Sequence, residues 1–358
     1  MKIVQVQTQA EAAGAQRVSD MVGDGLRARG HEVRTVFMYR KTEAYDADPH
    51  ADFILRERPR GALGLLRAII GLIGYMRRER PDAVISYQHY GNIFGTIAGR
   101  LAGAKHLIAN QSGAPGKHGG PLTLLADRLM GRTGFYDYSV VNSEWLAAQF
   151  WQFPASYRRR IRRIDHGVLS PADVLDRRTA RAAFGLPDNV ALAVSSGRFS
   201  KDKNQRALVE ALAQTPDYHL ALAGAGPERD ALLALAAERG VGDRLHLVGE
   251  VPPAKIFDFL AAGDVFVFAS RNETFGLSAA EAAIAGLPVV ANDLPVLREV
   301  LGDAAIYADS ERDGAMAAAI AQVMTQPELA GRLSAAGRAL RDKYAPATMC
   351  RAYEELLV

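Results

Sequence analysis

The chain has 358 residues, of which 49% are hydrophobic and 23% are charged, and its formal net charge is +3. This composition excludes a disordered chain, and the length predicts two domains. The single cysteine, Cys350, excludes an intramolecular disulfide or a multi-cysteine metal site and favours a reducing, cytoplasmic location.

Neither a signal peptide nor a membrane-spanning helix is expected. Residues 1–6 form a strand-like run, without a basic segment followed by an apolar one. The longest apolar stretch, residues 62–76, contains Arg67 and is shorter than the ~20 residues that span a bilayer. We therefore expect a soluble protein that is at most peripheral to a membrane.

Predicted strands alternate with helices along the whole chain. In chain order, the predicted strands are 2–6, 32–37, 83–86, 106–109, 139–142, 190–195, 219–223, 244–248, 265–269, 288–291 and 304–307. Amphipathic stretches of helical length lie between them, such as 17–29, 205–214 and 228–239. This alternation is typical of βαβ units and parallel sheets. Because one ordinary domain does not hold so many strands, we expect two α/β domains.

The composition changes between residues 165 and 187, where glycine, two prolines and scattered charges are typical of a linker. We therefore predict an N-terminal domain over residues 1–168 and a C-terminal domain over residues 169–343. Residues 344–358 are predicted to contain a last helix that packs back on the first domain. Ligands of such domains bind outside the carboxyl ends of the strands, so functional residues should follow strands.

The most specific pattern is a pair of glutamates, Glu273 and Glu281, which follows the predicted strand 265–269. Glu281 lies eight residues after Glu273, up to about 12 Å further along a helix. That separation fits carboxylates that hold opposite ends of an extended polar ligand. Alternatively, Glu273 only complements the helix dipole and Glu281 is a solvated helix position. Gly276, between them, lets the backbone approach a ligand at the helix N-terminus.

Three further loops follow strands in the second half. Arg198 and Lys203 are spaced to pair with phosphate oxygens, or they belong to a solvated charged turn. Gly224 begins a Gly-x-Gly turn that lacks the third glycine of a dinucleotide fingerprint. Val251 follows the strand 244–248, where the backbone could contact a base. Alone, each of the last two is more typical of an ordinary turn.

Together these features resemble the retaining nucleotide-sugar glycosyltransferases of family 4, over the whole chain and most strongly over residues 194–308. Such enzymes have the GT-B fold, in which two Rossmann-like domains face each other across a donor and acceptor cleft. The resemblance rests on the E-x7-E pair Glu273 and Glu281, on Gly197-Arg198 with Lys203-Asn204, and on segments 14–18, 29–33, 81–85, 285–291 and 297–300.

The resemblance implies a role for each glutamate. Glu273 is expected to hydrogen-bond the donor sugar, and Glu281 is expected to hold the ribose hydroxyls. The backbone is expected to contact the sugar and the phosphate at Phe275, Gly276 and Leu277.

The resemblance also implies how the reaction proceeds. Arg198 and Lys203 would neutralise the leaving diphosphate as negative charge builds on it. No metal and no other cofactor is expected, and the nucleotide-diphospho-sugar is a substrate, with UDP or GDP as the nucleotide. Retention would follow from attack of the acceptor on the front face, with the departing phosphate as the base.

Two departures from the family pattern fall in the first half. The glycine loop keeps Gly14, an expected donor-binding residue, but has Ala13 where the family usually has another glycine. The position of a family histidine near the sugar and acceptor is held by Gln111, which can hydrogen-bond a hydroxyl but cannot titrate near neutral pH. His89 and His118 lie nearby in the sequence and are the candidates to compensate, although a lone histidine there is more often a loop residue.

Positive charge is concentrated in the first half of the chain. Residues 1–170 contain 24 Lys and Arg against 15 Asp and Glu, whereas the remainder has a net charge of −6. The arginines cluster around the apolar run 61–76 and over residues 158–163. This apolar run with arginines at both ends has two interpretations. It is a helix that lies on an anionic membrane surface, or it is a core helix that packs on the sheet. A nucleic-acid partner is not expected, since no reader motif is present.

The resemblance therefore implies a retaining, metal-independent transfer of a hexose-type sugar to a hydroxyl acceptor. The acceptor would be a glycan or a lipid-linked glycan of bacterial surface polysaccharide, glycolipid or glycoconjugate assembly. One alternative is a GT-B subunit that binds a nucleotide or a partner and has lost transfer, which the substitution at Gln111 motivates. Another is a sugar-nucleotide epimerase of related architecture.

Overall fold

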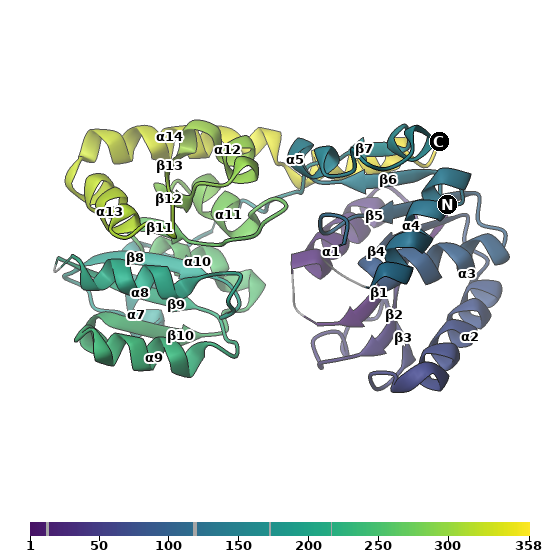
Figure 1. Cartoon of the computed structure of the whole chain (residues 1–358), viewed down its shortest axis with the longest axis horizontal. Coiled ribbons are helices and arrows are strands. Elements are labelled where there is room, and N and C mark those ends of the chain that lie inside the picture. The colour runs from purple at the N-terminus through teal and green to yellow at the C-terminus, as the bar shows by residue number, and fades with distance from the viewer. Residues whose placement is uncertain (12–13, 117–119, 172, 216) are drawn as a thin grey trace. The chain divides into compact units, whose positions relative to one another are not determined.

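The computed structural model describes residues 1–11, 14–116, 120–171, 173–215 and 217–358. They form two compact units (Figure 1). The first consists of Met1–Gly167 together with Pro346–Val358, and the second of Val168–Ala345. Ala13 and His118 lie outside the described residues.

The first unit contains a parallel sheet of seven strands in the order β3-β2-β1-β4-β5-β6-β7. The strands are β1 (Lys2–Ala10), β2 (Glu32–Arg40), β3 (Ala51–Leu55), β4 (Ala83–Tyr87), β5 (His106–Asn110), β6 (Tyr138–Val141) and β7 (Ile161–Arg163). The helices are α1 (Gly14–Ala28), α2 (Gly61–Glu79), the π-helical turn η1 (Gly91–Gly95), α3 (Thr96–Leu101), α4 (Pro121–Thr133), α5 (Glu144–Ala148), α6 (Ala155–Arg158) and α15 (Pro346–Glu355).

Helices cover both faces of this sheet, because successive strand side chains point to opposite sides. On one face Val4 of β1 packs in the same cluster as Leu72 of α2 and residues of α3. On the other face Ile3 of β1 packs in a cluster with Val22 of α1 and Tyr353 of α15. The last helix therefore completes the core of the first unit, although most of the chain separates it from α1.

All eleven predicted strands are confirmed, and the sheet contains two more, β3 and β7. Both are edge strands, and each pairs with only one neighbour. The sequence of β3 has a single β-branched residue, Ile54, and β7 consists of Ile161 and two arginines. Edge strands are often short and charged because this protects them from pairing with other chains, so they lack the pattern that identifies a buried strand.

Helix α2 packs on the sheet with one side, as the core-helix alternative predicts, and exposes apolar side chains on the other. Ala68, Leu72 and Met76 are buried on the sheet, as in a core helix. Leu63 and Ile70 on its other side are 69% and 60% exposed. Within the described residues, no helix is both long and apolar enough to cross a bilayer.

The second unit contains a parallel sheet of six strands in the order β10-β9-β8-β11-β12-β13. The strands are β8 (Ala191–Ser196), β9 (Tyr218–Ala223), β10 (Leu245–Gly249), β11 (Val265–Phe268), β12 (Val289–Asn292) and β13 (Ala305–Ala308). The helices are α7 (Arg177–Ala183), α8 (Gln205–Ala213), α9 (Arg229–Glu238), α10 (Ile256–Ala261), α11 (Leu277–Ala285), α12 (Pro295–Leu301), α13 (Ala315–Thr325) and α14 (Pro327–Lys343), with the 3₁₀ turns η2 (Gly242–Arg244), η3 (Pro253–Lys255) and η4 (Gly302–Ala304).

Backbone hydrogen bonds join the loops that follow β8, β9 and β10. The amide of Gly197 donates to the carbonyl of Ala223 over 2.9 Å, and the amide of Gly224 donates to the carbonyl of Gly249 over 2.7 Å. Gly224 has a φ of +144°, and a Cβ atom there would lie 2.1 Å from the carbonyl oxygen of Gly197. Only glycine permits this approach, so it holds the first two loops at a fixed distance.

Gly224→Ala should therefore destabilise the second unit by roughly 1–3 kcal/mol more than Gly197→Ala. Gly197 is the matched control, because its φ of +150° is similar and no atom lies within 4 Å of an added Cβ. Urea unfolding of both variants measures the difference. Equal losses of unfolding free energy would show that the contact between the loops adds nothing to the strain of the backbone.

Half-buried Asp20 is expected to make the stability of the fold depend on pH. Its carboxylate accepts a hydrogen bond from the Tyr45 hydroxyl over 2.7 Å. Burial, with smaller contributions from Asp48 and Asp24, raises the pKa of Asp20 from 3.8 to about 6. The unfolded chain thus loses this proton at lower pH than the folded chain, and folding is progressively penalised as pH rises from about 4 to about 6.

Asp20→Asn should remove that penalty, which is at most about 3 kcal/mol, while its amide oxygen still accepts from Tyr45. The variant should gain stability over the unaltered chain at pH 8 but little at pH 4, as thermal unfolding at the two pH values measures. Asp230→Asn, on the exposed side of α9, is the control. A gain that is the same at both pH values would contradict the assignment to Asp20.

Candidate functional site

The strand order of the second unit brings four loops to one edge of its sheet. The loops that follow β10, β9, β8 and β11 leave neighbouring parallel strands at their carboxyl ends. The connections run from β8 to β9 and β10 in one direction and from β11 to β12 and β13 in the other. The order therefore reverses between β8 and β11, the kind of point where open α/β sheets bind ligands.

Lys203 and Glu273 form an ion pair at this reversal point. Lys203 follows β8, Glu273 follows β11, and the Lys203 Nζ lies 2.5 Å from the Glu273 Oε1. The lysine side chain is 31% exposed and the glutamate side chain 11%. The ammonium group also lies 5.6 Å from the centre of the Phe268 ring. Two of the predicted site residues, 70 positions apart, are thus in direct contact.

Arg198 differs from Lys203 in having no carboxylate partner within the described ranges. It is exposed, and its backbone is held because its carbonyl accepts a hydrogen bond from the Gln205 side chain over 2.9 Å. Gln205 is 5% exposed and is the first residue of α8. The loop after β8 thus carries both a guanidinium group without a carboxylate partner and an ammonium group paired with a carboxylate.

The segment after β11 combines a buried anchor with a helix N-terminus. Phe275 is 2% exposed and packs edge-on against Tyr344 at 5.2 Å between ring centres. Gly276 has a φ of +84° and precedes Leu277, the first residue of α11. The free amides of this turn favour an anion. Glu281 is 1% exposed, so the alternative of a solvated helix position is wrong.

The remaining predicted donor-binding residues are Gly224, Val251 and Gly14, and the fold requires a glycine at only one of these positions. Gly224 is needed for the close approach to Gly197. Val251 is half-buried and follows β10 at the same sheet edge. Gly14, in the first unit, is the exposed first residue of α1, and nothing lies within 4 Å of an added Cβ, so the fold itself places no steric demand for glycine there.

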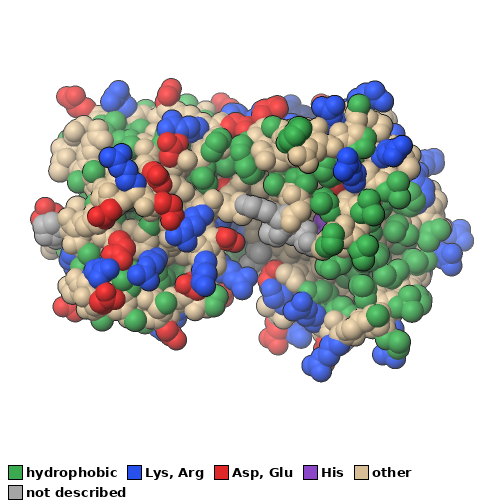
Figure 2. Space-filling model, viewed as in Figure 1, with side chains coloured by type: hydrophobic (Ala, Val, Ile, Leu, Met, Phe, Trp, Pro, Cys, Tyr) green, Lys and Arg blue, Asp and Glu red, His purple; other side chains and the backbone are tan. Residues whose placement is uncertain are grey.

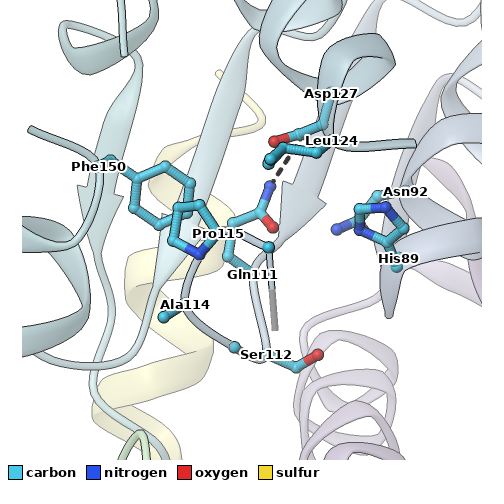
Figure 3. A pocket seen from close by; sticks show the side chains of 11 residues that line it. His89, Asn92, Gln111, Ser112, Ala114, Pro115, Leu124, Asp127 and Phe150 are labelled. Atoms are coloured by element: carbon cyan, nitrogen blue, oxygen red, sulfur yellow. Dashed lines mark hydrogen bonds between the residues drawn. The ribbon is translucent and has the colours of Figure 1, made fainter. Parts of the chain in front are cut away.

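In the first unit a pocket lies beside the carboxyl ends of β4 and β5 (Figure 3). The strand order of this unit reverses between β1 and β4, so the pocket also adjoins a reversal point. It brings together the predicted residues His89 and Gln111. The pocket is lined by His89, Asn92, Gln111, Ser112, Gly113, Ala114, Pro115, Gly116, Leu124, Asp127 and Phe150.

Asp127 beneath this pocket was missed by the sequence analysis. It is 5% exposed and accepts hydrogen bonds from the Tyr136 hydroxyl (2.8 Å), the Tyr157 hydroxyl (3.0 Å) and the Gln111 side-chain amide (3.2 Å). Burial raises the pKa of Asp127, and these three donors oppose the rise. The available signal was a lone acidic residue within the otherwise apolar and basic helix α4.

Among the described residues, no three His, Cys, Asp or Glu side chains cluster closely enough to hold a metal ion. An Asp-x-Asp sequence is present at Asp46 and Asp48, in the segment between β2 and β3. Asp46 pairs with Arg40, and Asp48 accepts a hydrogen bond from the His50 amide over 2.8 Å. These carboxylates are engaged in local turn structure.

Each half of the chain matches a model of a known family. Residues 13–167 match the glycosyl transferase 4-like domain, and residues 176–340 match the glycosyl transferases group 1. The boundary between the two matches lies close to the division between the two units at Gly167.

Relatives of known function match parts of the chain. A lipopolysaccharide core biosynthesis glycosyltransferase of Rhizobium meliloti is 34% identical over 180 residues, which is 49% of this chain and 52% of that protein. A D-inositol 3-phosphate glycosyltransferase of a Nocardioides species is 34% identical over 193 residues, which is 48% of this chain and 42% of that protein. The chain spans about half the length of the curated relatives it matches.

Solved structures match over almost the whole chain. HepE of Anabaena, in complex with UDP and glucose, has a TM-score of 0.86 at 20% identity, with 100% of this chain and 99% of that one covered. Sucrose-phosphate synthase of Thermosynechococcus elongatus has a TM-score of 0.84 at 21% identity, with 99% and 98% covered. These likenesses show the fold. The first half of the chain therefore matches the glycosyl transferase 4-like domain and the second half matches the glycosyl transferases group 1, and the two Rossmann-like units have the fold of GT-B structures.

Proposed function

We propose that this chain is a retaining glycosyltransferase that moves a hexose-type sugar from a nucleotide-diphospho-sugar to a hydroxyl acceptor, without a metal ion. The observation that carries the proposal is the Lys203–Glu273 ion pair at the reversal point of the second sheet, in which Lys203 shares its loop with the exposed Arg198. The glycosyltransferase matches of both halves support it, as does the structure of HepE in complex with UDP and glucose.

The ion pair couples recognition of the diphosphate to recognition of the donor sugar. An arriving diphosphate competes with Glu273 for the Lys203 ammonium group, because both are anions. Once Lys203 turns to the phosphate, the Glu273 carboxylate needs new hydrogen-bond donors, which the hydroxyls of the donor sugar supply. Arg198 adds a fork-shaped cation for the second phosphate, and Glu281 holds the ribose hydroxyls.

Cleavage of the bond between the sugar and the diphosphate is then assisted by positive charge that is already in place. Negative charge builds on the leaving diphosphate, where Arg198, Lys203 and the amides at the start of α11 stabilise it. The acceptor hydroxyl attacks the face that the phosphate leaves, and the phosphate oxygen takes its proton. The anomeric configuration of the product, read by proton NMR, tests this retaining course.

Lys203→Ala and Glu273→Gln should each lower the rate of sugar transfer or donor hydrolysis by about 100-fold or more, because each removes a charge aimed at the reacting groups. The assay follows release of UDP or GDP from the corresponding glucose donors, after thermal-shift screening has identified the nucleotide that binds. The matched control is Lys201→Ala, since Lys201 is exposed in the same loop and should leave the rate unchanged.

Each contrary outcome identifies an alternative function. Unchanged turnover in both variants would overturn the assigned site. Nucleotide binding by the unaltered chain without transfer or hydrolysis would instead indicate a binding subunit. An epimerised donor found without acceptor would indicate an epimerase.

A lipid-linked glycan at the cytoplasmic face of a membrane is the acceptor class that the first unit favours. Leu122, Leu125 and Leu129 on α4 are 80%, 62% and 55% exposed, and the exposed Arg128 and Arg132 lie on the same helix. Figure 2 shows hydrophobic side chains gathered over α2 and α4, with Lys and Arg around them. Exposed apolar and arginine side chains together suit an anionic bilayer surface. The buried free thiol of Cys350 agrees with a reducing compartment.

Leu125→Glu should weaken binding to vesicles that contain phosphatidylglycerol by about tenfold, because it places a carboxylate in the apolar contact. Co-sedimentation with phosphatidylglycerol vesicles, and with pure phosphatidylcholine vesicles for comparison, measures this. Leu233→Glu is the matched control, since Leu233 is 40% exposed on α9 of the second unit. No binding by the unaltered chain, or equal loss in the two variants, would contradict a membrane contact through α4.

A further inference from the structure

The side-chain amide of Gln111 is held in one orientation. Its Nε2 atom donates to Asp127 Oδ1 over 3.2 Å and to the Tyr157 hydroxyl over 3.1 Å. An amide nitrogen has two hydrogens, so both are used. Figure 3 shows the nitrogen directed at Asp127 and the oxygen turned away from it.

The partners of Gln111 are themselves fixed, which prevents the amide from turning over. Asp127 Oδ1 accepts from Tyr136 and Oδ2 accepts from Tyr157, and both tyrosines are almost fully buried. Burial raises the pKa of each tyrosine well above its ordinary value, so both hydroxyls remain donors. In the reversed orientation the Gln111 oxygen would meet a carboxylate oxygen, and two acceptors repel each other.

The rest of the pocket leaves the Gln111 oxygen as a defined acceptor. The Asn92 side chain is engaged with the Asn110 backbone in both directions, at 2.7 and 3.2 Å. The Asp127 oxygens already accept three bonds. No donor among the described residues reaches Gln111 Oε1, which belongs to a residue that lines the pocket.

We infer that Asp127 and Tyr157 are positioning residues that hold the Gln111 oxygen as a hydrogen-bond acceptor for a sugar hydroxyl in this pocket. The sugar class rests on the proposed function. An imidazole could donate or accept, whereas this oxygen only accepts, so the site should favour a ligand that brings an O–H group. Such a site rejects the corresponding deoxy sugar, because the oxygen would be left without a donor.

The hydroxyl could belong to the donor sugar or to the acceptor, and two probes separate these sources. Gln111→Leu should weaken binding of UDP-glucose, with UDP unchanged, if the donor sugar supplies the hydroxyl. It should instead weaken binding of methyl β-D-glucopyranoside to the UDP-loaded protein if the acceptor does. A loss of about tenfold is expected, as for one hydrogen bond. Unchanged binding of both probes would overturn the assignment of a sugar hydroxyl.

The positioning role has a readout that needs no ligand. The Gln111 side-chain amide, assigned in ¹⁵N spectra by its loss in Gln111→Leu, should exchange slowly with solvent in the unaltered chain. Tyr157→Phe removes one of its two acceptors and should speed that exchange by about tenfold. Tyr136→Phe is the matched control, because it removes a buried hydroxyl and an Asp127 hydrogen bond without touching Gln111.

Comparison of Tyr157→Phe with Tyr136→Phe decides whether Asp127 and Tyr157 position Gln111. Faster amide exchange, with the matching loss of sugar binding, in Tyr157→Phe alone supports positioning. Equal changes of amide exchange and sugar binding in both variants would show that the network acts only through the stability of the fold. That result would overturn the positioning role of Asp127 and Tyr157. If the unaltered chain binds no nucleotide, the proposed function fails, while the amide exchange still decides whether Asp127 and Tyr157 hold Gln111.

Discussion

Parallel pairing of neighbouring strands is the constraint on which the rest of the second unit depends. It brings the loops after β10, β9, β8 and β11 to a single sheet edge, and backbone hydrogen bonds then join the first three. Gly224 permits the closest of these contacts. Since the loops are held by backbone atoms, their side chains remain available for a ligand. The site is therefore a consequence of topology more than of any single side chain.

The ion pair at this edge shows how the fold accommodates a carboxylate that is only 11% exposed. Lys203 and Glu273 compensate each other, so the partly buried Glu273 is not left with an unpaired charge. Arg198 is exposed and hydrated, so it needs no partner. A diphosphate would redistribute these charges rather than neutralise an isolated cation. Under the proposed function, this one contact would link phosphate recognition to sugar recognition.

The first unit positions its polar groups through a buried network instead. Asp127 is expensive to bury, as the direction of its pKa shift indicates, and three donors offset that cost. This network also accepts both hydrogen bonds that the Gln111 amide donates, to Asp127 and to Tyr157. The sequence predicted Gln111, His89 and His118 for the acceptor side, which stays a prediction, and it did not single out Asp127. Its carboxylate lies on α4, sixteen residues from Gln111, and no local motif connects them.

By itself, the sequence determined the two Rossmann-like domains, eleven of the strands and the set of residues considered for the site, because strand periodicity and loop motifs are local. It did not identify β3 and β7, since edge strands lack a buried pattern. Only the tertiary structure decided that Lys203 contacts Glu273, that Glu281 is buried and that Asp127 holds Gln111. These contacts join residues that are distant in the chain or on different elements, and packing alone brings them together.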